Sequence, residues 1–103
     1  MEKKLKANKI KSWLSDNKEM SFIDVREIGQ HTEGHPFFSI SIPYSIFEYR
    51  LLELVPNKNV RVVLFDNNDG IASLAAKQAK LIGYANIFIL ENGIDGWLNE
   101  GFE

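Results

Sequence analysis

The chain has 103 residues, of which 45% are hydrophobic and 12% aromatic, so it can build one packed domain and is not expected to be disordered. Its net charge of -2 provides no basic excess, which argues against a nucleic-acid-binding role. The chain contains no cysteine, which excludes disulfides, thiolate metal sites and thiol catalysis.

The first half of the chain is predicted to alternate helices with short strands. The N-terminal helix is indicated by apolar residues at helical spacing, namely Ile10, Trp13 and Leu14. A strand follows at residues 22–25, and another at residues 40–42 is stopped by Pro43. An amphipathic helix should then end before Pro56. Its apolar positions are Ile46, Tyr49, Leu52, Leu54 and Val55.

The second half contains the longest apolar segment, residues 60–65, which is rich in β-branched residues and predicts a central strand of a parallel sheet. The clearest helix is predicted at residues 71–82, ended by Gly83. One face of this helix should carry Leu74, Ala75, Gln78, Ala79 and Ile82. A further strand at residues 87–90 precedes a short helix at 94–99.

This order of elements predicts an α/β fold, with an open, mostly parallel central sheet of about five strands and helices on both faces. No repeat or linker interrupts the chain, so we expect a single domain over residues 1–103. No apolar run approaches 18 residues and no secretory signal is visible, so we predict a cytoplasmic protein with no membrane partner.

Polar residues follow the central strand, at the edge where open parallel sheets collect ligands. The loop reads Asp66-Asn67-Asn68-Asp69-Gly70 and leads directly into the best predicted helix. Unpaired N–H groups at a helix N-terminus can bind an anion, which makes the loop a candidate site. Asn and Asp are also common turn and N-cap residues, so a purely structural role explains the same sequence.

Known phosphate and metal motifs do not fit this loop. A P-loop requires a lysine directly after its last glycine, and none follows Gly70. An EF-hand loop has glycine sixth, whereas Gly70 is fifth. The haloacid dehalogenase motif has its second aspartate two residues after the first, whereas Asp69 is three residues after Asp66. No cofactor is predicted.

The two histidines, His31 and His35, are four residues apart, a spacing that would place two metal ligands on one face of a helix. Gly34 and Pro36 make a helix through His35 improbable. We therefore interpret both histidines as structural or surface residues and predict no metal site.

Four segments, in order and at the same spacing, resemble the rhodanese homology domain over nearly the whole chain. They are Ile23-Asp24-Val25-Arg26-Glu27, then Gly34-His35 with Ile40-Ser41-Ile42-Pro43, then Leu81-Ile82-Gly83-Tyr84, and finally Leu90-Glu91-Asn92-Gly93-Ile94-Asp95-Gly96-Trp97. In that family the residues matching Asp24, Arg26 and His35 look like framework residues. Trp97 is expected to be core.

The family's active loop follows the central strand and often reads Cys-Arg-x-Gly-x-Arg-Ser. The resemblance puts Asp66 at the cysteine position, and Asn67 and Ile71 where arginines are common. Gly70 is displaced from the usual glycine position. The resemblance therefore implies a vestigial active-site loop with no catalytic residue. Its residues are Asp66, Asn67, Asn68, Asp69, Gly70, Ile71 and Ala72.

These observations predict a catalytically inactive rhodanese-like module with a binding, regulatory or scaffolding role, either alone or within a longer multidomain protein. Its partner would be another protein or an active rhodanese domain. The alternatives are a sulfurtransferase by family membership, or metal-assisted phosphoryl transfer by Asp66 and Asp69. Phe37 and Phe38 are interpreted either as an exposed apolar edge for a partner or as core.

Overall fold

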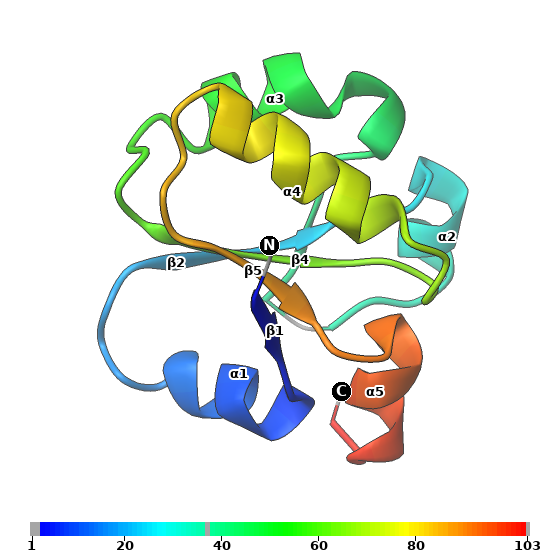
Figure 1. Ribbon diagram of the computed structural model, residues 1–103. Helices are drawn as coiled ribbons and strands as arrows, with labels where there is room; N and C mark the ends of the chain where they lie inside the picture. Colours follow the sequence, from blue (N-terminus) through cyan, green and yellow to red (C-terminus); the bar gives the residue numbers. More distant parts are fainter. Residues whose placement is uncertain (1–2, 37, 103) are drawn as a thin grey trace.

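The computed structural model describes residues 3–36 and 38–102, and shows one five-stranded, entirely parallel sheet (Figure 1). The strands are β1 (Lys3–Leu5), β2 (Met20–Asp24), β3 (Ile40–Ser41), β4 (Arg61–Phe65) and β5 (Ile87–Leu90). Their order across the sheet is β1-β5-β4-β2-β3, so β4 is the central strand. The predicted sheet, its parallel direction and its central strand are confirmed.

Helices cover both faces of the sheet, as predicted. They are α1 (Ala7–Trp13), α2 (Ile28–Glu33), the 3-10 turn η1 (Tyr44–Ile46), α3 (Phe47–Leu54), α4 (Ile71–Leu81) and α5 (Gly93–Asn99). Helices α3 and α4 lie on one face, while α1 and α5 lie on the other (Figure 1). Within the described ranges, no helix has the length and apolar character needed to cross a membrane.

The central strand explains why its sequence is apolar throughout. Successive side chains of a strand point to opposite faces, and both faces here are covered. Val62 and Leu64 belong to the core beneath α3 and α4, whereas Val63 and Phe65 belong to the core beneath α1 and α5. Trp97 is buried in this second core, where the sequence placed it.

The buried faces of α3 and α4 differ from the predicted ones. Helix α4 packs through four alanines, Ala72, Ala75, Ala76 and Ala79, while Leu74 is exposed. Helix α3 buries Phe47 and Leu51. Its predicted apolar positions Ile46, Tyr49, Leu52 and Leu54 are exposed, and only Val55 is buried. Both helices carry apolar residues on more than one side, so spacing alone could not select the packed face.

Strand β1 and helix α2 were absent from the sequence-based prediction, as was the 3-10 turn η1. Strand β1 consists of two lysines and a leucine and pairs along β5 at the sheet edge, where lysine is a common residue. Helix α2 is only six residues long and ends before Gly34, so His35 lies outside it, as expected from the glycine.

Candidate functional site

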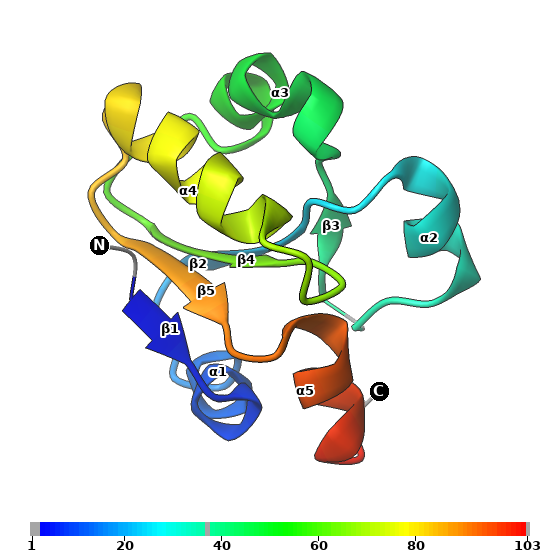
Figure 2. The same cartoon turned by 45° about the vertical axis from the view of Figure 1, so that its right-hand side comes forward.

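The loop after β4 lies at the carboxyl edge of the sheet, next to the start of α5 (Figure 2). Strand β4 ends at Phe65, so Asp66 is the first residue beyond it, and α4 begins at Ile71. The chain reverses within these few residues because Asn68 and Gly70 adopt left-handed backbone conformations, with φ of 65° and 87°. The loop therefore occupies the position expected from the sequence.

Asp66 is 5% exposed and binds the backbone of its own loop. Its Oδ1 accepts a hydrogen bond from the Asn68 N–H at 2.7 Å, and its Oδ2 accepts one from the Ala72 N–H at 2.9 Å. Asp69 is exposed and accepts only a longer bond, 3.4 Å, from the Ile71 N–H. The two aspartates thus differ: one is an internal anion for the loop amides, and the other is a surface turn residue.

The turn before α5 closes over Asp66 from a second side. The Ile94 N–H donates to the Asp66 carbonyl oxygen at 2.8 Å. Gly93 has φ of 58°, and a Cβ there would lie 2.6 Å from both the Asn68 nitrogen and the Asp66 carbonyl oxygen. Only glycine permits this approach. The sequence analysis missed the contact, although the Asn92-Gly93 pair signals a tight turn.

A second buried carboxylate, Asp24, lies at the end of the neighbouring strand β2. It is 0% exposed and accepts four hydrogen bonds. Three come from Arg26, through its backbone N–H, Nε and Nη2, and one joins the carboxylate to Nδ1 of His31 at 2.9 Å. Arg26 also donates from Nη2 to the Gly34 carbonyl at 2.7 Å. Asp24 and Arg26 therefore form a structural ion pair.

The two histidines are brought together by ring stacking and a hydrogen bond. Their rings stack with centroids 3.8 Å apart, and Nδ1 of His35 contacts the His31 carbonyl oxygen at 2.8 Å. In the part of the chain that the structure describes, no three His, Cys, Asp or Glu side chains are grouped as metal ligands would be. The histidines instead connect α2 to the segment that follows it.

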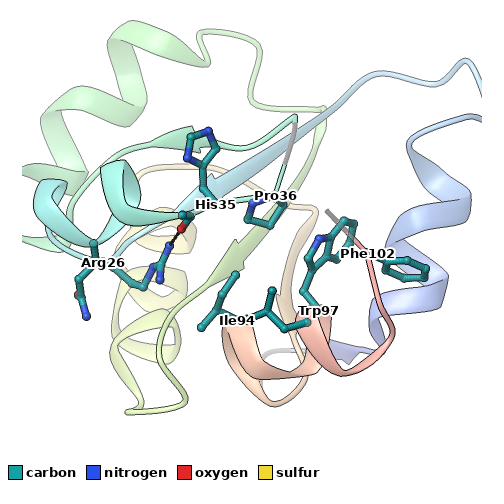
Figure 3. Close-up of a pocket in the computed structure, with 9 residues that line it drawn as sticks. Arg26, His35, Pro36, Ile94, Trp97 and Phe102 are labelled. Carbon is teal, nitrogen blue, oxygen red and sulfur yellow. Dashed lines mark hydrogen bonds between the residues drawn. The ribbon is translucent and has the colours of Figure 1, made fainter.

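A cavity of about 430 Å³ opens between this segment and α5 (Figure 3). We call it the α2–α5 cavity, and its lining residues are Arg26, Gln30, Gly34, His35, Pro36, Ile94, Trp97, Leu98 and Phe102. The loop residues from Asp66 to Ala72 do not line it. Phe38, two residues after Pro36, is exposed. Phe37, the other residue of the predicted apolar edge, lies outside the described residues.

Comparisons with a family model and with solved structures find the same kind of domain. The family model described as Rhodanese-like domain matches residues 6–100. A crystal structure of a thiosulfate sulfurtransferase from Pseudomonas aeruginosa superposes with a TM-score of 0.93 and 29% identity, covering 98% of this chain and 19% of that one. The chain thus spans only a fifth of that protein. No curated protein matches in a direct comparison.

Two further solved structures share the fold. A rhodanese-like domain from Anabaena, solved by NMR, has a TM-score of 0.89 and 21% identity, covering 99% of this chain and 77% of that one. A rhodanese with anions from E. coli has a TM-score of 0.66 and 26% identity, covering 72% of this chain and 91% of that one. Their TM-scores show that both share the overall fold of this chain.

Proposed function

Since the chain belongs to the family of rhodanese-like domains, we propose that it is a catalytically inactive member with a binding, regulatory or scaffolding role. Sulfur transfer requires a nucleophilic sulfur that accepts and then releases a sulfur atom. The chain has no cysteine, and a carboxylate cannot form a persulfide. The observation that carries the proposal is Asp66, which stands directly after β4 and occupies loop amides with its own carboxylate.

The geometry of the loop supports inactivity beyond the missing thiol. A substrate anion would compete with Asp66 for the Asn68 and Ala72 N–H groups, and would be repelled by its charge. The Gly93 turn packs against the same residues and leaves no space for an added methyl group. In this arrangement the carboxylate of Asp66 occupies the Asn68 and Ala72 amides, which are then not available to a substrate anion.

Because this domain is proposed to be inactive, any catalytic step would be carried out by a partner that it binds. The partner would be another protein or an active rhodanese domain, on the same chain or on a separate one. The Pseudomonas sulfurtransferase contains a region similar to this chain within a longer protein, since this chain covers 19% of it, and this supports an arrangement on the same chain. Phe38, which is exposed and lies two residues before β3, is one apolar contact point for such a partner.

The metal-assisted alternative receives less support from the geometry. Phosphoryl transfer by Asp66 and Asp69 would need both carboxylates to face one cation. Asp66 instead points inward to backbone donors, and Asp69 lies at the exposed surface. No observation favours this second function.

The proposal is tested by a thiosulfate:cyanide sulfurtransferase assay on the purified chain, beside its Asp66→Cys and Asp69→Cys variants. We expect wild type to match the no-enzyme blank, because it has no thiolate. Asp66→Cys places a thiol against the loop amides, and mass spectrometry should detect a persulfide formed from thiosulfate with release of sulfite. Asp69→Cys provides an exposed thiol in the same loop and should acquire less persulfide.

Two outcomes would overturn the proposal. Reproducible sulfur transfer by a metal-free wild-type preparation would show an enzyme that needs no cysteine. Magnesium-dependent hydrolysis of p-nitrophenyl phosphate that is abolished by Asp66→Asn would instead support the phosphoryl-transfer alternative.

A further inference from the structure

The α2–α5 cavity is separate from the Asp66 loop and has no role in the proposed function. Its volume of about 430 Å³ falls within the range of about 300–1,000 Å³ common for small-molecule sites. Its two walls have different origins. One is built by the segment from Arg26 to Pro36, and the other by α5 and Phe102 (Figure 3).

The first wall presents a hydrogen-bond donor that the protein leaves unused. The Arg26 side chain is only 8% exposed, and its Nε and Nη2 are engaged by Asp24 and by the Gly34 carbonyl. Its Nη1 donates no hydrogen bond to any residue in 3–36 or 38–102. Nη1 is not among the fully buried polar atoms that lack a partner, so it meets solvent at the cavity and can donate to an acceptor brought by a ligand.

The charges around the cavity favour an anionic acceptor. None of the nine described lining residues is acidic, whereas Arg26 is cationic. The adjacent carboxylate, Asp24, is fully buried and already accepts four hydrogen bonds. Gln30, which is uncharged, lines the same wall. A carboxylate would thus find a donor and no opposing negative charge among the lining residues.

The second wall is apolar and firmly packed. Ile94, Trp97 and Leu98 come from α5, and the rings of Trp97 and Phe102 meet edge to face with centroids 5.0 Å apart. Leu98 is 58% exposed, although it is a large apolar residue beside an open cavity. Covering Leu98 with an apolar group would remove its surface from water, which is favourable.

From these two walls we propose that the α2–α5 cavity binds a small organic acid, with its carboxylate toward Arg26 and its apolar body against α5. The proposal is independent of whether the Asp66 loop is catalytically inactive, because none of the loop residues lines the cavity. Arg26 would act on the ligand through Nη1, while Asp24 holds the guanidinium in place.

The proposal is tested with 3-phenylpropionate as the probe and its neutral amide as the matched ligand, by amide chemical-shift titration of the isotope-labelled chain. We expect saturable shifts confined to residues 26–36 and 93–102. The amide should bind about tenfold more weakly, because it loses the charge-assisted part of the hydrogen bond to Arg26. This comparison avoids substituting Arg26, whose loss would disturb Asp24.

Leu98→Glu and Leu81→Glu form the matched pair of variants. Both place a carboxylate on an exposed leucine, but Leu98 lines the cavity and Leu81, 86% exposed, ends α4. We expect Leu98→Glu to weaken probe binding at least about tenfold and Leu81→Glu to leave it unchanged. Absence of saturable shifts, equal binding of acid and amide, or wild-type affinity in Leu98→Glu would each overturn the proposal.

Discussion

Two carboxylates are buried side by side at the carboxyl edge of the sheet, and they are satisfied in opposite ways. Asp24 ends β2 and is held by the side chains of Arg26 and His31, together with the Arg26 backbone. Asp66 follows β4 and is held by backbone N–H groups alone. Both carboxylates therefore bind residues close to them along the chain, but Asp24 fixes the side chains of Arg26 and His31, whereas Asp66 stabilises the backbone of its own loop.

The comparison predicts that losing Asp24 costs far more than losing Asp66. Asp24→Ala leaves the mostly buried Arg26 without its partner, so we expect a loss of about 3–5 kcal/mol in the free energy of unfolding, measured in urea. A second variant, Asp24→Ala with Arg26→Leu, removes both charges and should lose less than Asp24→Ala alone. If the double variant is the less stable one, the cost does not come from the unpaired guanidinium.

The Gly93 turn tests how tightly the Asp66 loop is held from outside. Gly93→Ala would press a methyl group onto the Asn68 nitrogen and the Asp66 carbonyl, in a backbone conformation unfavourable for alanine. Gly101 also has a positive φ, 76°, but no heavy atom lies within 4 Å of a Cβ added there. We expect Gly93→Ala to be less stable than Gly101→Ala by about 1–3 kcal/mol in thermal melts. Equal losses would mean that the turn can move away from the loop.

A smaller effect is expected at Asp66 itself. Asp66→Ala removes an acceptor for two backbone N–H groups, and should cost about 1–2 kcal/mol, similar to losing a helix N-cap. The freed amides should then bind sulfate weakly, so sulfate should raise the melting temperature of the variant more than that of wild type. Asp69→Ala is the control, because Asp69 is exposed and its hydrogen bond to the Ile71 N–H is long, at 3.4 Å. Equal stability and equal sulfate responses in Asp66→Ala and wild type would make Asp66 a simple turn residue.

The sequence was sufficient to predict those helices and strands whose local pattern of apolar residues agrees with their burial in the fold. Strand β4 and helix α4 were predicted because one is a continuous apolar, β-branched run and the other a long helical pattern. The position of the loop followed from these two elements. Strand β1 was missed because its lysines carry no strand signal, and only pairing with β5 makes it a strand.

Contacts between distant segments were the least predictable. Nothing in the local sequence of Asp66 shows that Gly93 packs against it, since the contact depends on how β5 and α5 return to the sheet edge. The ion pair of Asp24 and Arg26 was expected only from the family resemblance. The α2–α5 cavity could not be foreseen, because its walls come from opposite ends of the chain.

The smallest effect is expected at the surface pair of Asp16 and Arg61, which repeats the Asp24 arrangement without deep burial. Hydrogen bonds from the Arg61 guanidinium and the Lys18 N–H lower the pKa of Asp16 below its ordinary value. Because the pKa is lower in the folded state, the pair stabilises the fold above the pKa of unfolded aspartate, about 3.9, and this contribution disappears as the pH falls through the folded value.

Arg61→Gln should raise the pKa of Asp16, as followed by carboxyl NMR titration, because the largest stabilising contact of the ionised form is removed. Arg50→Gln is the control: it removes the same charge from another surface pair, with Glu53, and should leave the titration of Asp16 unchanged. An equal response to both substitutions would mean that overall charge, not pairing, sets the pKa. A selective response would show that Arg61 pairs with Asp16 in solution. Any greater loss on breaking the Asp24 pair would then reflect its burial together with the additional hydrogen bond between Asp24 and His31.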